Sequence, residues 1–463
     1  MRSTDVTFDP GIMHRYDREG PRYTSYPTAR QFHDRLPPDA YSRAASTSRG
    51  AAEGGPLSVY VHLPFCFSPC FYCGCNKVVT HQLSRVEAYV RRLLEEVERR
   101  SVYFDRGRVV QQLHFGGGTP TFLPKRRLIE LIDRLGRDFQ LTVDESRDYS
   151  IEVDPRGTDH GMMQLLAELG FNRISLGVQD FDANVQRAVN RVQPASSVQG
   201  VYESARKLGF RSINFDLIYG LPCQTAATFG ATLDRVIELR PDRLAVYGYA
   251  HMPKLFKAQR QIRSGDLPDA PARLGLLQLT VDKLCTAGYV YIGMDHFALP
   301  GDSLAIAREN GTLHRTFQGY TTHADRDLVS FGVSAIGQIG DLYMQNHKSL
   351  PEYEKAIDRG ELPSHQGTRM SADDLIRRDV INRIMCHGFV DTAAIEGSHG
   401  IDFRKYFCRE LEQLQHLLAD GLVDLNNARI ELTPVGRLLM RNVAMTFDAY
   451  LGADLRPPMS RVI

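Results

Sequence analysis

Alternation between short apolar segments and longer amphipathic ones constrains the fold of this chain more than any other feature. A short apolar run bounded by turn residues is typical of a buried strand, and a hydrophobic repeat of about 3.6 residues indicates a helix with one apolar face. The predicted strands are 57–62, 109–115, 149–153, 173–178, 213–218 and 244–249, and the helices after them begin near 84, 127, 162, 197, 226 and 272. Strands and helices in this order form a parallel sheet.

The fold class is therefore α/β, with about six βα units in a barrel or an open part-barrel. A closed eightfold barrel is disfavoured because eight units cannot be found. A capping box is predicted at the start of the first helix, where Ser84 precedes Glu87 by three residues. A last strand is predicted at 289–294.

The two ends of the chain differ from this central part. Residues 1–50 form an irregular leader rich in Pro, Arg and Tyr, and its composition would suit a lid over a substrate. The part-barrel is assigned to residues 51–350. Residues 351–463 are mainly helical, with helices predicted at 371–386, 403–418 and 434–445 and a hairpin around Asn426-Asn427, an order that resembles a winged helix.

Charge argues against nucleic acid and membrane surfaces as partners. The chain holds 56 Lys and Arg against 55 Asp and Glu, a net charge of +1, and residues 371–463 carry a net charge of −2. The stretch from Gly54 to Asn76 lacks charged residues, but its prolines, glycines and cysteines exclude a membrane-spanning helix. The N-terminus carries no apolar export signal, so we expect a cytoplasmic protein.

Four of the eight cysteines crowd into that uncharged stretch, spaced Cys66-x3-Cys70-x2-Cys73-x-Cys75. In a reducing compartment, clustered cysteines indicate a metal or redox site more than disulfides. A structural zinc site usually brings two ligand pairs separated by a longer loop. An aromatic-flanked loop of this kind favours an iron–sulfur cluster, with zinc second and a catalytic or structural role for the thiols third.

Other polar and glycine residues follow the same edge of the predicted sheet, because they lie where successive strands end. They are the glycines 116–118, Glu152 and Asp154, Gln179 and Asp180, Asp216, and residues 249–251. Function in parallel βα barrels gathers at the carboxyl ends of the strands. Their common location predicts one site next to the cysteines.

The C-x3-C-x2-C spacing after the first strand of a βα series resembles the signature of the radical S-adenosylmethionine (SAM) superfamily. Beyond the superfamily, almost the whole chain resembles the oxygen-independent coproporphyrinogen III oxidases. The matching segments include residues 20–29 of the leader, 60–66, 73–77, 115–121, 151–155, 177–181, 216–222, 293–300, 313–322 and 332–336. The leader and Cys75 distinguish these oxidases from related haem chaperones.

The resemblance implies two cofactors: a 4Fe–4S cluster, held by Cys66, Cys70 and Cys73, and two molecules of SAM. Cys75 would be needed without ligating the cluster, and Cys75 and Tyr60 are the implied catalytic residues. Tyr60, Gly117, Glu152 and Ile336 match positions around the cluster-bound SAM. Tyr72, Gly118, Thr119, Gln179, Arg191, Asp216 and Ala250 match positions around the second SAM.

The implied reaction converts coproporphyrinogen III to protoporphyrinogen IX. A 5′-deoxyadenosyl radical removes hydrogen from two propionate groups, and each then loses CO₂ and one electron to become a vinyl group. Arg22 and Arg30 of the leader are the predicted substrate contacts, because Arg pairs bidentately with carboxylate. The partners expected are a low-potential electron donor such as a flavodoxin or ferredoxin, and the protein is expected to be a monomer.

Three alternatives remain open at this point. The first is a related radical SAM enzyme acting on haem or porphyrin, such as a methyltransferase or a haem-degrading enzyme. The second is a haem chaperone, and the third is a zinc-stabilised regulator that uses the winged-helix-like tail. Iron content, SAM cleavage and CO₂ release would separate them.

Overall fold

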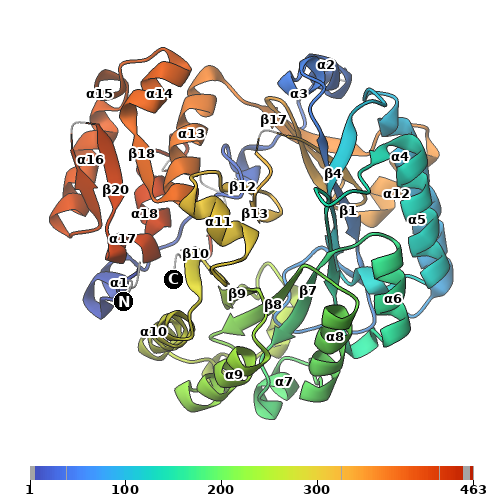
Figure 1. Ribbon diagram of the computed structural model, residues 1–463, viewed down its shortest axis with the longest axis horizontal. Helices are drawn as coiled ribbons and strands as arrows, with labels where there is room; N and C mark the ends of the chain where they lie inside the picture. Colours follow the sequence, from blue (N-terminus) through green and yellow to red (C-terminus); the bar gives the residue numbers. More distant parts are fainter. Residues whose placement is uncertain (1–5, 38, 325, 427, 452–458, 462–463) are drawn as a thin grey trace.

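A large curved sheet forms the centre of the computed structural model, which describes residues 6–37, 39–324, 326–426, 428–451 and 459–461 (Figure 1). Its strands follow the order β10-β11-β9-β8-β7-β6-β4-β1-β14-β15-β16-β17, and the short β5 (Gln140–Leu141) pairs with β4. Helices lie along the outer face of the curve, and the C-terminal helices form a separate group beside one edge (Figure 1).

Six neighbouring parallel strands confirm the predicted βα series. They are β1 (Leu57–Leu63), β4 (Val109–Gly117), β6 (Asp148–Val153), β7 (Arg173–Gln179), β8 (Ser212–Tyr219) and β9 (Arg243–Gly248). The helices after them are α4 (Leu83–Ser101), α5 (Lys125–Asp138), α6 (His160–Glu168), α7 (Ala183–Ala188) with α8 (Ala195–Lys207), α9 (Ala226–Leu239) and α10 (Ala270–Thr286). No helix in the described part of the chain is long and apolar enough to cross a membrane.

Alternation along these strands sends apolar side chains outward and polar ones into the lumen of the part-barrel. In β6, Tyr149, Ile151 and Val153 are buried, whereas the intervening Ser150 and Glu152 are only partly buried and line the lumen. In β7 the buried Ile174, Leu176 and Val178 repeat the pattern. A period of two residues places successive side chains on opposite faces of a sheet. The helices therefore cover an apolar face, and the lumen stays polar.

Both edges of the sheet contain strands that run outside the βα series. On one side β14 (Asp327–Phe331) pairs parallel with β1, and β15 (Ile336–Ile339), β16 (Leu342–Asn346) and β17 (Ser364–Arg369) continue antiparallel, with α12 (Leu350–Asp358) before β17. On the other side lie β10 (Val290–Gly293) and β11 (His296–Ala298), followed by α11 (Ser303–Glu309), β12 (His314–Thr316) and β13 (Gly319–Thr321). The strand predicted at 289–294 is β10, but its antiparallel pairing with β11 means that it is not a seventh βα unit.

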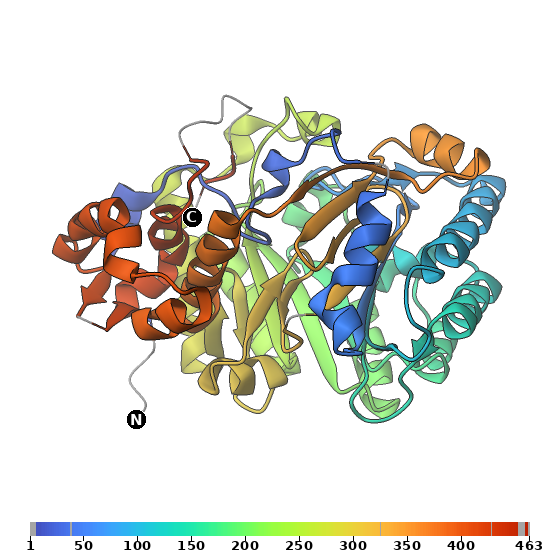
Figure 2. The same ribbon diagram turned by 90° about the horizontal axis from the view of Figure 1, so that it is seen from above.

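The leader runs between the C-terminal helices and the sheet, where Figure 2 shows it in blue. Its short helices are α1 (Pro10–Tyr16), η1 (Ala29–Gln31), α2 (Ala40–Thr47) and α3 (Arg49–Ala52), joined by irregular segments. Two isolated bridges fix it in place, one from Glu19 to Arg461 and one from His33 to Gly367 of β17. The leader is thus attached to both halves of the molecule.

The C-terminal region contains the predicted mixture of helices and hairpin. Its elements are α13 (Ala372–His387), β18 (Phe389–Asp391), α14 (Thr392–His399), α15 (Phe403–Tyr406), α16 (Cys408–Ala419), β19 (Val423–Leu425), β20 (Arg429–Leu432), α17 (Pro434–Leu438) and α18 (Met440–Met445). Strands β19 and β20 form the hairpin, in whose turn Asn427 lies outside the described residues. The predicted helices at 403–418 and 434–445 are each broken, at Phe407 and Leu439, where the chain turns so that both side chains are buried.

The capping box predicted at Ser84 is wrong. Helix α4 begins at Leu83, so its N-cap is Gln82, two residues before Ser84, and no side chain caps it. The carboxylate of Glu87 instead pairs with Arg126 and Arg127 of α5. An ion pair between helices therefore replaces the local hydrogen bond that the spacing suggested.

Candidate functional site

The cysteine loop leaves the sheet at the carboxyl end of β1. Two short strands, β2 (Phe65–Cys66) and β3 (Val78–Val79), pair parallel and close the loop at its base. Phe65 anchors that base, since its buried ring packs edge-on against the ring of Tyr89, with the ring centroids 5.4 Å apart. This closure holds the four thiols in one compact segment at the mouth of the part-barrel.

Each of the three motif thiols receives a separate polar contact. Thr119 Oγ1 lies 3.5 Å from Cys66 Sγ, Arg191 donates to Cys70 Sγ at 3.5 Å, and the backbone N–H of Cys75 donates to Cys73 Sγ at 3.4 Å. Donors directed at sulfur stabilise thiolates and tune the metals they bind. This donor set fits a group with thiolate ligands. In the described residues, no three Cys, His, Asp or Glu side chains are arranged to hold a single metal ion.

The thiols differ in how readily they ionise. Burial raises the pKa of the Cys66 thiol to about 11, while a hydrogen bond from the Cys75 side chain lowers the pKa of Cys73 to about 5. The same contact, together with burial, raises the pKa of Cys75 well above its ordinary value. The hydrogen bond between the two thiols thus favours the thiolate form of Cys73 and the neutral form of Cys75.

A cavity of about 640 Å³ fills the lumen from this loop inward. It brings together all but four of the predicted site residues, although they come from seven separate segments of the chain. The predicted residues in its wall are Cys66, Cys70, Tyr72, Cys73, Cys75, Gly117, Gly118, Thr119, Glu152, Gln179, Arg191, Asp216 and Ala250. The carboxyl ends of neighbouring parallel strands lie side by side, which explains why these separate segments meet at one cavity.

The glycine run after β4 is required by close packing. The backbone of Gly117 has φ +118°, and a Cβ atom there would lie 2.8 Å from the ring of His62. A Cβ on Gly118 would lie 2.6 Å from the carbonyl oxygen of Pro64. The backbone N–H of Gly117 donates to Glu152 Oε2 at 3.0 Å, so the missing side chains let the strand end contact the Glu152 carboxylate.

Two carboxylates face the cavity with opposite pKa shifts. Burial alone would raise the pKa of Glu152, but its contacts with His114 and the Gly117 N–H lower it below the ordinary value. Burial raises the pKa of Asp216 to about 6, and this effect exceeds the opposing hydrogen bonds from Ser175 and Asn214. Glu152 is thus ionised at neutral pH. Burial disfavours the charged form of Asp216, and a hydrogen-bond donor on a ligand would stabilise that form.

Arg191 links the cysteine loop to the ends of two strands. It is buried, and it donates to Asp154 at 3.2 Å and to the carbonyl oxygen of Gly177 at 2.6 Å, besides its contact with Cys70. Gln179 ends β7 with φ +66°, a conformation that L-residues seldom adopt. The mouth therefore combines a fixed cation with a strained strand end, as functional sites often do.

The four remaining predicted residues lie outside the wall of this cavity. Tyr60 stacks on His114 with ring centroids 5.8 Å apart, and its hydroxyl is 3.0 Å from His62 Nδ1. Ile336 begins β15 and packs beside a small cluster that includes Phe32. Arg30 lies in η1 and Arg22 lines a second cavity.

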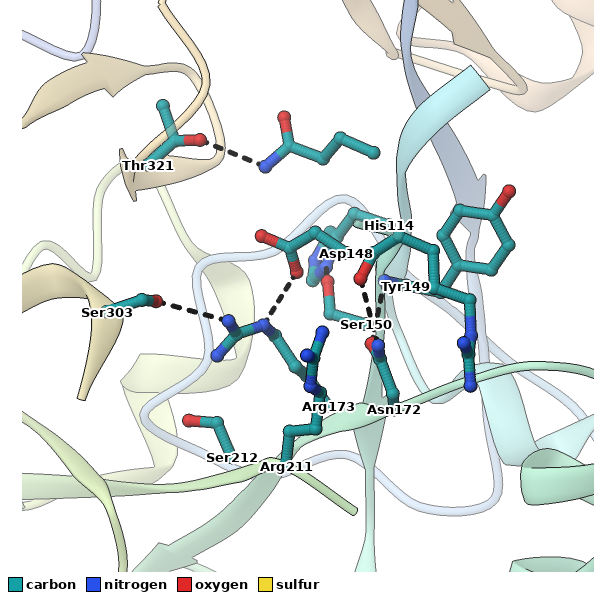
Figure 3. A network of polar contacts seen from close by, with 12 residues as sticks. His114, Asp148, Tyr149, Ser150, Asn172, Arg173, Arg211, Ser212, Ser303 and Thr321 are labelled. Atoms are coloured by element: carbon teal, nitrogen blue, oxygen red, sulfur yellow. Dashed lines mark hydrogen bonds and ion pairs between the residues drawn. The ribbon is translucent and has the colours of Figure 1, made fainter. Parts of the chain in front are cut away.

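Sequence reasoning missed a second group of polar residues in and around the lumen, part of which Figure 3 shows. Arg173 Nε pairs with Asp148 at 2.8 Å, and its NH2 donates to Ser303 at 3.1 Å (Figure 3). His114 contacts Ser150 at 2.6 Å on the neighbouring strand. Alternating polar residues along 148–153 and 173–179 were the signal that could have revealed them.

Two family models match the chain. The model of the Radical SAM superfamily matches residues 60–236, which include the cysteine loop and the first strands of the series. The model of the HemN C-terminal domain matches residues 370–439, which begin just before α13. The two matches correspond to the part-barrel and to the C-terminal helical region.

Curated proteins named oxygen-independent coproporphyrinogen III oxidase are similar along the whole chain. The protein from Pseudomonas aeruginosa is 51% identical over 458 residues, which cover 99% of both chains. The protein from Escherichia coli is 46% identical over 464 residues, covering 100% of each. A solved structure described as coproporphyrinogen III oxidase (HemN) from Escherichia coli, a radical SAM enzyme, superposes with a TM-score of 0.92 at 44% identity, covering 97% of this chain and all of that one.

Proposed function

The chain belongs to the oxygen-independent coproporphyrinogen III oxidases of the radical SAM superfamily, and we propose that its lumen cavity converts two propionate groups of coproporphyrinogen III to vinyl groups. It is an oxidoreductase of the radical SAM type. The observation that carries the proposal is the meeting of the cysteine loop, the glycine run and two carboxylates in one cavity. These are the parts that a cluster, SAM and a substrate side chain need within reach of one another.

A 4Fe–4S cluster and SAM are the cofactors of this superfamily. Cys66, Cys70 and Cys73 would ligate the cluster, in keeping with their separate polar contacts. We propose two SAM molecules. One would lie near Tyr60, Gly117, Glu152 and Ile336, of which Gly117 and Glu152 line the cavity and the other two lie outside its wall. The second would lie against the cavity residues Tyr72, Gly118, Thr119, Gln179, Arg191, Asp216 and Ala250. The carboxylates can accept hydrogen bonds from amino and hydroxyl groups of SAM, and the Arg191 guanidinium can pair with its carboxylate.

When bound, the cluster and SAM supply the organic radical that removes a hydrogen atom from the substrate propionate, after which CO₂ and one electron leave. The chain supplies orientation and exclusion of water. Tyr60 is fixed by His62 and by stacking on His114. Burial raises the pKa of the Tyr60 hydroxyl well above its ordinary value, so it remains a hydrogen-bond donor. The raised pKa of Cys75 favours its neutral thiol, which can donate a hydrogen bond to a bound group.

Substrate and partner contacts complete the proposal. Arg22 and Arg30 of the leader would pair with substrate carboxylates, and the leader would act as a lid over the mouth, because it runs between the sheet and the C-terminal region (Figure 2). A low-potential flavodoxin or ferredoxin would supply the electron. The enzyme would work as a monomer in the cytoplasm.

Isotope transfer tests this function directly. The protein is reconstituted anaerobically with iron and sulfide and given SAM, a reductant and coproporphyrinogen III deuterated at the propionate β-carbons. We expect deuterium in the 5′-deoxyadenosine, CO₂ release and protoporphyrinogen IX. Cleavage of SAM without deuterium transfer or CO₂ would refute the oxidase function and favour the related radical SAM enzymes or the haem chaperones.

A further inference from the structure

A second cavity, of about 810 Å³, lies beside the lumen at the carboxyl ends of β8 and β9. The two cavities share Gly248, Tyr249 and Ala250 in their walls. A molecule in the second cavity would therefore contact the segment that also borders the proposed SAM site. Apart from these three shared residues, the second cavity is lined by different side chains.

The lining of this second cavity is amphiphilic. Apolar side chains come from the loop after β9 and from the start of α10, and Leu255 among them is 59% exposed. Basic side chains come from five separate segments, whereas among the described residues that line the cavity the acidic ones are only Glu19 and Asp295. The basic residues are Arg22, Lys254, Arg273, Arg441 and Arg461. Asp17 pairs with Arg273 and with Arg461, but the basic side chains still outnumber the acidic ones. An apolar surface with surplus positive charge suits a ligand that has an apolar body and several carboxylates.

Two of these arginines are held on the inner side of the cavity. Arg22 pairs with Asp295 and lies 5.6 Å from the centre of the Tyr247 ring. Arg441 is buried and donates to backbone carbonyl oxygens of Pro21 at 2.9 Å and of Arg461 at 3.1 Å. Burial, and then the charge of Arg22, lower the pKa of Arg441 to about 10. Asp295, which pairs with Arg22, offsets part of this repulsion, and a carboxylate on a bound ligand would offset more of it.

The wall between the two cavities is tied to the cysteine loop. Gln259 Nε2 donates to the carbonyl oxygens of Tyr72 at 3.0 Å and Ala250 at 3.1 Å. Phe256 also packs on the loop, because a Cβ atom on Gly74 would lie 3.0 Å from its ring. A ligand in the second cavity would therefore be held at a fixed position relative to the proposed cluster.

We propose that the second cavity binds the macrocycle of the tetracarboxylate tetrapyrrole, with its non-reacting propionates on Arg22, Lys254 and Arg273. The reacting propionate would then pass Tyr249 and Ala250 into the lumen. Arg supplies two parallel hydrogen bonds to a carboxylate, and Leu255 supplies apolar area under the ring. This inference rests on the proposed function, since it places that function's substrate.

Two exposed positions allow a test without disturbing the fold. The test variants are Leu255→Glu and Lys254→Glu. For each we would measure the binding of coproporphyrin III by fluorescence anisotropy, and the KM for coproporphyrinogen III. The control is Val143→Glu, because Val143 is 87% exposed on a loop between β5 and β6. We expect both cavity variants to bind at least about tenfold more weakly, since the new carboxylate repels the ligand's carboxylates. Val143→Glu should stay within about twofold of the wild type.

A second probe separates charge recognition from apolar contact. The tetramethyl ester of coproporphyrin III carries no carboxylates, so Lys254→Glu should bind it as the wild type does, while Leu255→Glu should still bind it more weakly. If the wild type turns over coproporphyrinogen III and both variants keep its KM and its porphyrin affinity, the cavity assignment is overturned and the proposed function stands. Weakened porphyrin binding in both variants, with no vinyl product from the wild type, would support the cavity assignment and overturn the proposed function.

Discussion

Replacing Asp216 by Asn should stabilise the fold while it weakens the binding of SAM. The carboxylate accepts hydrogen bonds from Ser175 at 2.7 Å and from Asn214 at 2.9 Å, yet burial still raises its pKa from 3.8 to about 6. Folding therefore forces a charge into a site that disfavours it. Such a cost is expected where a residue is retained for a ligand rather than for stability.

The magnitude and the sign follow from the two pKa values of Asp216. Below pH 3 the carboxyl is neutral in both states and contributes no cost, whereas above pH 6 the folded state carries the full cost. One pKa unit corresponds to about 1.4 kcal/mol, so the shift from 3.8 to about 6 costs about 3 kcal/mol at pH 7.5. Water in the lumen screens part of this, and we expect Asp216→Asn to stabilise the protein by about 1 to 3 kcal/mol at pH 7.5 and by less than about 1 kcal/mol at pH 4.5.

The assay is anaerobic urea unfolding of wild type and variant at both pH values, with SAM binding measured by equilibrium dialysis. Asp133→Asn on the exposed face of α5 is the matched control, and its free energy of unfolding should change by less than about 0.5 kcal/mol. An Asp216→Asn protein that is less stable than the wild type at pH 7.5 would show that burial does not disfavour the charged carboxylate. A difference in free energy of unfolding that does not vary with pH would show the same.

Three further substitutions test other parts of the molecule. Gly118→Ala should lose most of the cluster iron, because its Cβ would lie 2.6 Å from a backbone oxygen at the base of the cysteine loop. Elemental analysis measures the iron, and Gly275→Ala is the control that should keep it, because no atom lies within 4 Å of its added Cβ. Glu96→Ala should cost about 3 to 5 kcal/mol in urea unfolding, because it leaves the buried Arg100 without its ion pair, and an unchanged midpoint would contradict this. Cys75→Ser should retain iron but lose at least about 100-fold in turnover, and loss of iron would show instead that Cys75 is a ligand.

Much of the fold could be predicted because strand and helix periodicities are local properties. Each of the six units carries its own apolar pattern, so the series β1 to β9 followed from the sequence. The strands β14 to β17 were missed because they pair with a sheet edge that the chain reaches only after the whole series, and short mixed segments give no strong period. The capping box at Ser84 failed for a related reason, since a helix packed alongside took the carboxylate of Glu87.

Some residues of the site could be predicted from the sequence in the same way, and others could not. Cys66, Gly117 and Asp216 could be placed at one mouth because parallel strands end on the same side. The position of Arg22 could not be predicted, because the leader is held by single bridges and by contacts with the C-terminal region rather than by any repeating pattern. The second cavity was also beyond prediction, since it forms where seven separate segments of the chain meet.

The central claim is that this cavity decarboxylates two propionates of one substrate. The most direct measurement is the stoichiometry of anaerobic turnover with coproporphyrinogen III, recording CO₂, methionine and protoporphyrinogen IX together. We expect two molecules of CO₂ for each protoporphyrinogen IX formed, with at least one SAM cleaved for each CO₂. Methionine formation without CO₂, or CO₂ release that does not require SAM, would contradict it.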